Sequence, residues 1–180
     1  AYEMVFEAFE MSEKIHVPVM MRMVTRLAHS RAVVHPKDEN ALLKENVLEK
    51  ANRQEWMLLP ALARKNYQNM LEKQKDLTAW ACNTQWNPLV LNEKRKDLAI
   101  ITSGLGKNYY NENLTDYAKK GELPSTLHIG SLPLPVDSVQ KLAEIAETIL
   151  VIEEGMPFIE KTLAGVLPQK TKIIGKLTGH

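Results

Sequence analysis

The chain has 180 residues, and its 23 Lys and Arg residues almost balance its 22 Asp and Glu residues, for a formal net charge of +1. This balance gives no electrostatic reason to expect a nucleic acid or an anionic membrane as the main partner. A chain of this length can bury a substantial core, and its one cysteine, Cys82, excludes an intrachain disulfide and a site built from several cysteines.

The first 15 residues carry the pattern of an amphipathic helix. Val5, Ala8 and Ile15 recur at helical spacing, and most of the glutamates fall elsewhere. This stretch is too acidic and too periodic for a secretion signal, and no apolar run approaches the ~20 residues of a membrane span. We therefore expect a cytoplasmic protein. Residues 16–25, rich in Val and Met around Pro18, predict a buried strand.

Residues 37–95 are charged and helix-prone, and they predict a helical connector without a sheet. After Pro88 strands and helices alternate. We predict strands at 97–103, 125–131, 149–155 and 170–177, with helices at 107–119, 133–148 and 156–167. Because helical crossovers connect parallel strands, residues 96–180 predict a three-layer α/β/α unit with a mainly parallel sheet.

Gly104 and Gly106 follow the first of these strands and raise the question of a phosphate-binding turn. A dinucleotide fingerprint would place a third glycine where Tyr109 stands, and no Lys-Ser or Lys-Thr pair follows for a triphosphate loop. A tight turn that needs glycine is the favoured interpretation. Ser103 lacks the Gly-x-Ser-x-Gly context of a serine nucleophile.

Thr25, Arg26, His29 and Ser30 lie at the end of the predicted strand at 16–25 and directly beyond it, where α/β proteins often place functional side chains. The arginine and the histidine could pair with a carboxylate or a phosphate. A hydrogen-bonded loop or an interdomain contact explains the four residues equally well.

The remaining candidates are weaker. We expect no metal site, because the histidines show no ligand spacing (His16, His35, His128 and His180). His128 lies in a predicted strand and is expected to be a hydrogen-bonded core or face residue. Glu153 and Glu154 end a strand and point to opposite faces, so capping of the next helix is their expected role. Packing is favoured over base stacking for Tyr109, Tyr110 and Tyr117.

Five stretches taken in order resemble a known family. They are EAFEMSEKIHVPVMMRMVTRLAHSRAVV, MLLPALARKNYQNMLEK, AIITSGLGKNYYNE, LHIGSLPLPVDSVQKLAE and ILVIEEGMPFIEKTL. Together they resemble the alpha subunit of indolepyruvate:ferredoxin oxidoreductase, a thiamine-dependent 2-oxoacid:ferredoxin oxidoreductase.

The resemblance implies that the chain is an internal piece of a longer subunit. Residues 1–36 would be the C-terminal end of the thiamine pyrimidine-binding domain. Residues 37–95 would connect it to residues 96–180, which would form a domain similar to the C-terminal domain of transketolase. The implied activity is oxidative decarboxylation of aryl 2-oxoacids to acyl-CoA, with ferredoxin as electron acceptor. Thiamine diphosphate, magnesium and iron–sulfur clusters are implied for the full protein, and none for this piece. A beta subunit, ferredoxin and coenzyme A are the implied partners.

No catalytic, cofactor-binding or metal residue of the family transfers to this sequence. The glutamate that activates thiamine would lie before Ala1, and a Gly-Asp-Gly motif would follow His180. Thr25, Arg26, His29 and Ser30 match a family stretch and imply at most an interdomain or site-rim role. The piece alone is therefore expected to be inactive. A separate nucleotide-binding or protein-interaction α/β domain remains the alternative.

Overall fold

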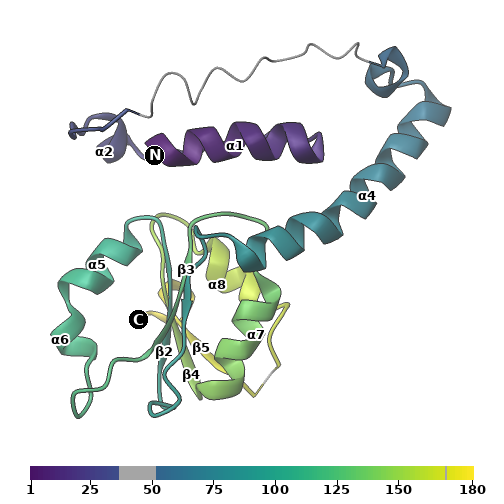
Figure 1. Cartoon of the computed structure of the whole chain (residues 1–180). Coiled ribbons are helices and arrows are strands. Elements are labelled where there is room, and N and C mark those ends of the chain that lie inside the picture. Colours follow the sequence, from purple (N-terminus) through teal and green to yellow (C-terminus); the bar gives the residue numbers. More distant parts are fainter. Residues whose placement is uncertain (37–51, 169) are drawn as a thin grey trace. The chain divides into compact units, whose positions relative to one another are not determined.

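The computed structural model describes residues 1–36, 52–168 and 170–180 (Figure 1). The chain divides into two compact units, Ala1–Gln68 and Asn69–His180.

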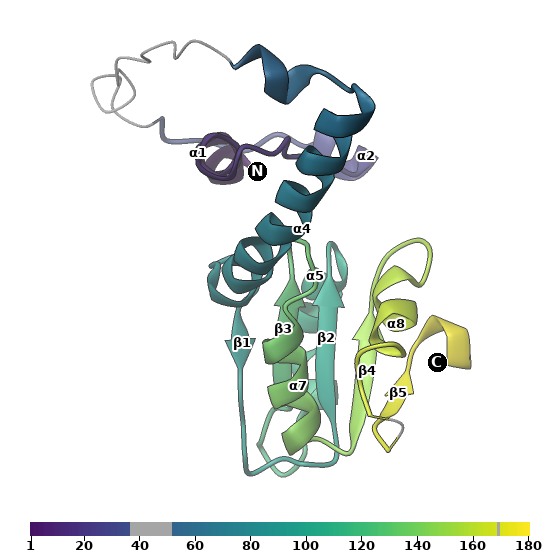
Figure 2. The same ribbon diagram turned by 90° about the vertical axis from the view of Figure 1, so that its right-hand side faces the viewer.

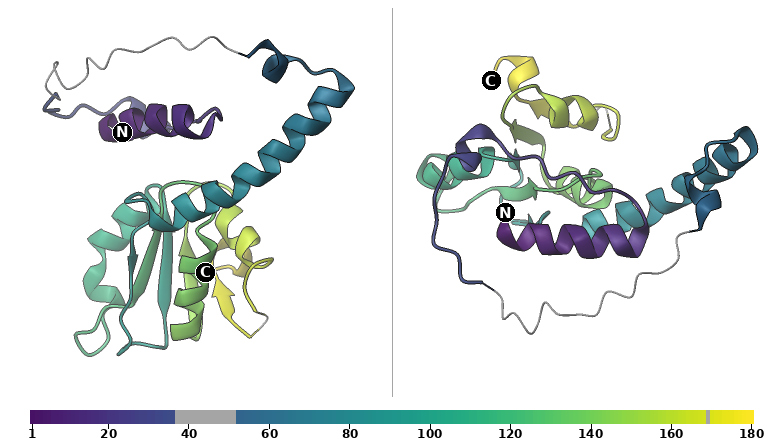
Figure 3. Two further views of the ribbon diagram at one scale, coloured as in Figure 1. Left: turned by 45° about the vertical axis from the view of Figure 1, so that its right-hand side comes forward. Right: turned by 90° about the horizontal axis from the view of Figure 1, so that it is seen from above.

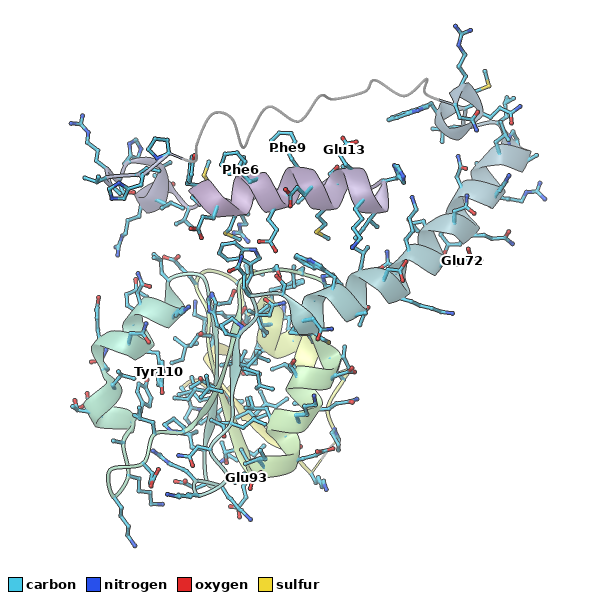
Figure 4. All side chains as sticks on the ribbon, in the orientation of Figure 1. Phe6, Phe9, Glu13, Glu72, Glu93 and Tyr110 are labelled. Carbon is cyan, nitrogen blue, oxygen red and sulfur yellow. The ribbon has the colours of Figure 1, made fainter. Side chains whose placement is uncertain are left out.

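The first unit begins with α1 (Tyr2–Ile15), as predicted from the apolar spacing. The helix ends at His16, which takes a left-handed conformation with φ 56° and donates its backbone N–H to Ser12. None of its residues is buried. Phe6 and Phe9 project from the same side of α1 (Figure 4), and the Phe9 side chain is 70% exposed.

The strand predicted at residues 16–25 is absent, which corrects the sequence interpretation. Residues 18–24 have no regular secondary structure, and α2 (Thr25–Ala28) is a single helical turn. Met20 is 93% exposed rather than buried. A strand requires hydrogen-bonded neighbours, and in the described residues this segment pairs with none.

Helices make up much of the described part of the predicted connector, although residues 57–59 and 84–88 are not helical. It contains η1 (Arg53–Trp56) and α4 (Pro60–Asn83), which spans 24 residues and begins at a proline, a residue suited to a first helical turn. Residues 37–51 lie outside the described part. The prediction of no sheet is wrong at β1 (Leu89–Val90), which pairs antiparallel with β3.

The second unit contains a five-stranded sheet in the order β1-β3-β2-β4-β5. The strands β2 (Ala99–Ser103), β3 (Ser125–Ile129), β4 (Thr148–Ile152) and β5 (Lys172–Ile174) are parallel to one another. Each forms where the sequence predicts a strand. Among the five described strands only β1 runs antiparallel, so the predicted α/β class with a mainly parallel sheet is confirmed.

Helices connect these strands at the predicted places. They are α5 (Gly106–Glu112), α6 (Leu114–Tyr117), α7 (Val136–Ile145) and α8 (Phe158–Leu163). The short η2 (Lys176–Thr178) follows β5 and takes up the end of the stretch 170–177 that the sequence predicts as a strand. The single helix expected at 107–119 is interrupted at Asn113, whose φ of −117° and ψ of 29° are not helical. In Figures 2 and 3, α5 and α6 lie on one side of the sheet and α7 on the other.

The two faces of the sheet carry different side chains. Ala99 and Ile101 of β2 belong to a buried cluster with Leu142 of α7 and Leu163 of α8. The alternate residues point to the face that α5 covers, where Tyr110 is 7% exposed. Figure 4 shows Tyr110 between α5 and the sheet. The α7 face thus holds most of the apolar core.

Candidate functional site

The carboxyl edge of the sheet is the place where open α/β folds collect ligands. The chain passes from β2 to β3 on one side and then to β4 on the other side of β2. The loop after β2 leads to α5, and the loop after β4 leads to α8, which cover opposite faces. This reversal makes the ends of β2 and β4 the candidate site.

The two positions in the turn after β2 require glycine for different structural reasons. Gly104 has φ +55°, a conformation that L side chains rarely adopt, and an added Cβ would have open space around it. At Gly106 an added Cβ would lie 2.2 Å from the carbonyl oxygen of Ile152 on β4. The favoured interpretation, a turn that requires glycine, therefore has a physical basis at both positions.

His128 lies on β3 beside Thr102 of β2, and its Nδ1 atom is 3.0 Å from the Thr102 hydroxyl. Burial lowers the pKa of His128 to about 4, and the charge of Lys107 acts in the same direction, whereas a hydrogen bond to Thr102 opposes them. The imidazole is therefore neutral at pH 7. His128 is a hydrogen-bonded face residue, as the sequence predicts.

Glu153 and Glu154 separate at the end of β4. Glu153 is 8% exposed, and its carboxylate accepts the backbone N–H groups of Ile159 (2.8 Å) and Glu160 (3.0 Å) at the start of α8. Glu154 is exposed. Glu153 therefore caps the next helix, as predicted. Its oxygens accept hydrogen bonds from N–H groups that the first turn of a helix leaves free.

Asn87 is an organising residue that the sequence interpretation missed. It is 3% exposed, its Nδ2 donates to the carbonyls of Ala81 and Ser131, and its Oδ1 accepts the N–H groups of Gly130 and Ser131. One side chain thus joins the end of α4 to the loop after β3. In the described residues the Ser131 hydroxyl is buried without a partner, for which the structure offers no explanation.

The tyrosines divide between core and surface. Tyr110 is buried, and its ring centroid lies 5.3 Å from that of Tyr117. Tyr109 is 42% exposed. The expected packing role holds for Tyr110 and Tyr117, since they contact each other at one side of the sheet.

Thr25, Arg26, His29 and Ser30 all belong to the first unit, in or next to α2, and all are exposed. Their described contacts are local. The His29 backbone N–H donates to Thr25, and the Ser30 hydroxyl donates to the Leu27 carbonyl at 2.8 Å. An interdomain or site-rim role for these four residues stays a prediction.

The described part of the chain offers neither a cluster of metal-ligating side chains nor a membrane-spanning helix. Within residues 1–36, 52–168 and 170–180, no group of three or more His, Cys, Asp or Glu residues could hold a metal ion. Over those same ranges, no helix has the length and apolar character that a bilayer crossing requires.

Comparison with known sequences gives one consistent result. No family model matches the chain. It is 31% identical over 176 residues to the indolepyruvate oxidoreductase subunit IorA of Methanothermobacter marburgensis, covering 96% of this chain and 28% of that protein. The subunit of the same name from Archaeoglobus fulgidus is 29% identical over 180 residues, covering 96% of this chain and 27% of its own length.

These matches confirm the resemblance drawn from the five sequence stretches. The chain spans less than a third of the length of these relatives. A solved structure of 2-oxoglutarate:ferredoxin oxidoreductase from Magnetococcus marinus is similar with a TM-score of 0.51 and 14% identity, covering 66% of this chain and 21% of that chain. At this identity the similarity supports the fold alone.

Proposed function

We infer from one premise: this chain is related over nearly its whole length to part of the indolepyruvate oxidoreductase subunit IorA. We propose that the chain is a supporting segment of such a subunit. The observation that carries the proposal is the extent of the match, 96% of the chain at 31% identity. A relationship that extends over nearly the whole chain supports a shared fold with the matching part of the longer protein.

The whole protein would oxidatively decarboxylate an aryl 2-oxoacid such as indolepyruvate to an acyl-CoA and pass electrons to ferredoxin. Thiamine diphosphate would supply the carbon chemistry, with magnesium to hold it and iron–sulfur clusters to carry electrons. Among the described residues, no group of three or more His, Cys, Asp or Glu side chains could hold magnesium or an iron–sulfur cluster. We therefore assign no step of the reaction to a residue of this chain.

The proposed role of the chain is to position other parts of the enzyme. Its carboxyl-edge residues already have structural partners, since Glu153 caps α8 and Gly106 contacts β4. We propose that residues 1–36 are the end of a thiamine pyrimidine-binding domain and that residues 37–95 are a connector. Residues 96–180 would form a domain similar to the C-terminal domain of transketolase. Other domains of the subunit and a beta subunit would be its partners, in the cytoplasm.

The exposed apolar side chains of the first unit support this role. Phe9 is 70% exposed, Met20 93% and Trp56 78%. Large apolar surfaces are typical of contacts with another protein surface. Thr25, Arg26, His29 and Ser30 lie in the same unit and are proposed to border such a contact.

The nucleotide sequence on both sides of the coding segment tests the proposal. We expect an open reading frame with a thiamine-binding domain upstream, and a Gly-Asp-Gly motif and clustered cysteines downstream. Flanking sequence that encodes unrelated domains would contradict it.

The alternative, a separate nucleotide-binding domain that uses the Gly104–Gly106 turn, predicts a different result. NAD or ATP would then raise the thermal midpoint of the chain, because a ligand that binds only the folded state stabilises it. The supporting role predicts that neither nucleotide raises the thermal midpoint through this turn. A rise in the midpoint that is lost in Gly104→Ala would therefore favour the alternative.

A further inference from the structure

An open surface cavity of about 210 Å³ is lined by residues that precede β2 and β3, so it lies at the amino-terminal edge of the sheet, opposite the candidate site. All six residues that line it are charged: Lys94, Arg95, Asp97, Lys119, Lys120 and Glu122. Four are cations and two are carboxylates, so the lining has an excess of two positive charges, whereas the whole chain carries +1. Such a concentration of charge favours an anion.

Arg95 is the fixed centre of this cavity. It is 8% exposed, its Nε donates to Asp97 at 3.1 Å, and its Nη1 donates to the carbonyls of Tyr117 and Glu122. Among the described contacts, these bonds use the Nε and Nη1 hydrogens and leave the two Nη2 hydrogens for another acceptor. A guanidinium fixed in this way is well suited to bind a phosphate oxygen.

Lys120 occupies an unusual backbone conformation beside Arg95. Lys119 and Glu122 exchange two backbone hydrogen bonds of 3.0 Å, and the two residues between them have positive φ, 53° at Lys120 and 80° at Gly121. Turns of this kind favour Asn or Gly at the first of these positions. Lys120 departs from this preference, and its side chain lines the cavity.

The other two lysines of the cavity are already paired. Lys119 lies 3.0 Å from Asp97, and Lys94 lies 3.6 Å from Glu122. Lys119 and Arg95 hold the pKa of Asp97 below its usual value, so this carboxyl group stays ionised. Lys120 forms no ion pair within the described residues, which leaves its ammonium group for a ligand.

We propose that this cavity binds a phosphate group, either inorganic phosphate or the phosphoryl end of a small molecule. Two negative charges on the phosphate would balance the two excess positive charges of the lining. The Nη2 donors of Arg95 and the ammonium group of Lys120 would contact its oxygens. This inference does not depend on the oxidoreductase assignment, because it rests on the charges and contacts of residues 94–122 alone.

The test measures binding of inorganic phosphate to the whole chain by calorimetry, with sodium chloride keeping the ionic strength constant. We expect saturable binding, and we expect Lys120→Gly to weaken it at least about tenfold, the loss expected for one charged contact. Lys120→Gly also removes the backbone strain, so the variant should melt at a higher temperature without ligand. Lost affinity therefore cannot be attributed to misfolding.

Two controls complete the experiment. Lys141→Gln removes an exposed lysine of α7 outside the cavity and should leave binding unchanged. Glycerol 2-phosphate, a monoester, separates the two ligand sources: tighter binding than inorganic phosphate indicates a phosphorylated molecule, and weaker binding indicates free phosphate. Absence of saturable binding of both probes, or equal affinities in Lys120→Gly and the unmodified chain, would overturn the proposal.

Discussion

The Glu153 carboxylate lies 2.8 Å from the backbone nitrogen of Ile159, and this hydrogen bond joins the end of β4 to the start of α8. The two residues are buried and six positions apart. A side chain at the carboxyl edge of a parallel sheet, where catalytic groups often lie, is thus engaged in holding a helix. The same relationship is repeated at the neighbouring N–H of Glu160.

Glu153→Ala should destabilise the second unit by about 2–3 kcal/mol, because two buried N–H groups lose a charged acceptor. Glu153→Gln retains one acceptor oxygen and should cost about half as much. Urea unfolding followed by circular dichroism measures both. Glu154→Ala, at the adjacent exposed position, is the matched control and should change stability by less than about 0.5 kcal/mol. Equal costs at the two positions would contradict the capping role.

Gly106→Ala should destabilise the folded chain far more than Gly104→Ala does. The added methyl group at Gly106 would meet the backbone of Ile152 at 2.2 Å, which the sheet cannot move away cheaply, so we expect a loss of about 3 kcal/mol or more. Alanine at Gly104 meets no atom within 4 Å and bears only the cost of its positive φ, about 1 kcal/mol. Denaturant midpoints for both variants provide the comparison, and the reverse order would show that packing against β4 is not the reason for Gly106.

Asn87→Ala should cost about 3 kcal/mol, since two backbone carbonyls and two N–H groups lose their partner in a buried position. Hydrogen exchange should also accelerate at Gly130 and Ser131, whose N–H groups Asn87 accepts. Asn83→Ala removes an exposed amide whose described hydrogen bond, to the Ala79 carbonyl, lies within α4, and it serves as the control. Unchanged exchange in the loop after β3 would refute the role assigned to Asn87.

The folded state should lose stability as the pH falls from about 6.5 toward 4. The pKa of His128 is about 4 in the folded chain, below the ordinary 6.5, so between these values the unfolded chain binds the extra proton more readily. The contribution of neutral His128 is complete above pH 6.5 and absent below pH 4. We expect about 1–2 kcal/mol, less than full linkage because the ring is partly exposed.

The free energy of unfolding at pH 7 and pH 5 measures this effect. His128→Gln has no ionisable ring, so its stability should vary less with pH over this interval. An identical pH dependence in the variant and the unmodified chain would assign the effect to other groups.

The sheet could be predicted because its strands are short apolar runs between glycines and prolines. Ile100, Ile101 and Val151 lie in such runs, and burial on both faces is what a central parallel strand requires. The Val and Met run at 16–25 shows the limit of this argument. Composition gives a strand preference, but strand formation depends on a neighbouring strand that the sequence pattern does not identify.

The candidate sites were less predictable for a related reason. Asn87 bonds to Ser131, 44 positions away, and a single asparagine in a polar stretch gives no periodic signal of this contact. Arg95 and Lys120 are ordinary surface residues in sequence and come together only through the fold. The Lys119-Lys120-Gly121 run was a usable signal, since Gly after a charged pair before a strand indicates a tight turn.

Indolepyruvate-dependent reduction of a viologen dye, with thiamine diphosphate, magnesium and coenzyme A present, tests the supporting role most directly. The measurement compares the chain alone with a hybrid. In the hybrid, the IorA subunit from Methanothermobacter marburgensis carries this chain in place of the segment that matches it, and this subunit is assembled with the other subunit of the enzyme. The account predicts no turnover by the chain and clear turnover by the hybrid. Turnover by the chain alone, or an assembled hybrid without activity, would contradict it.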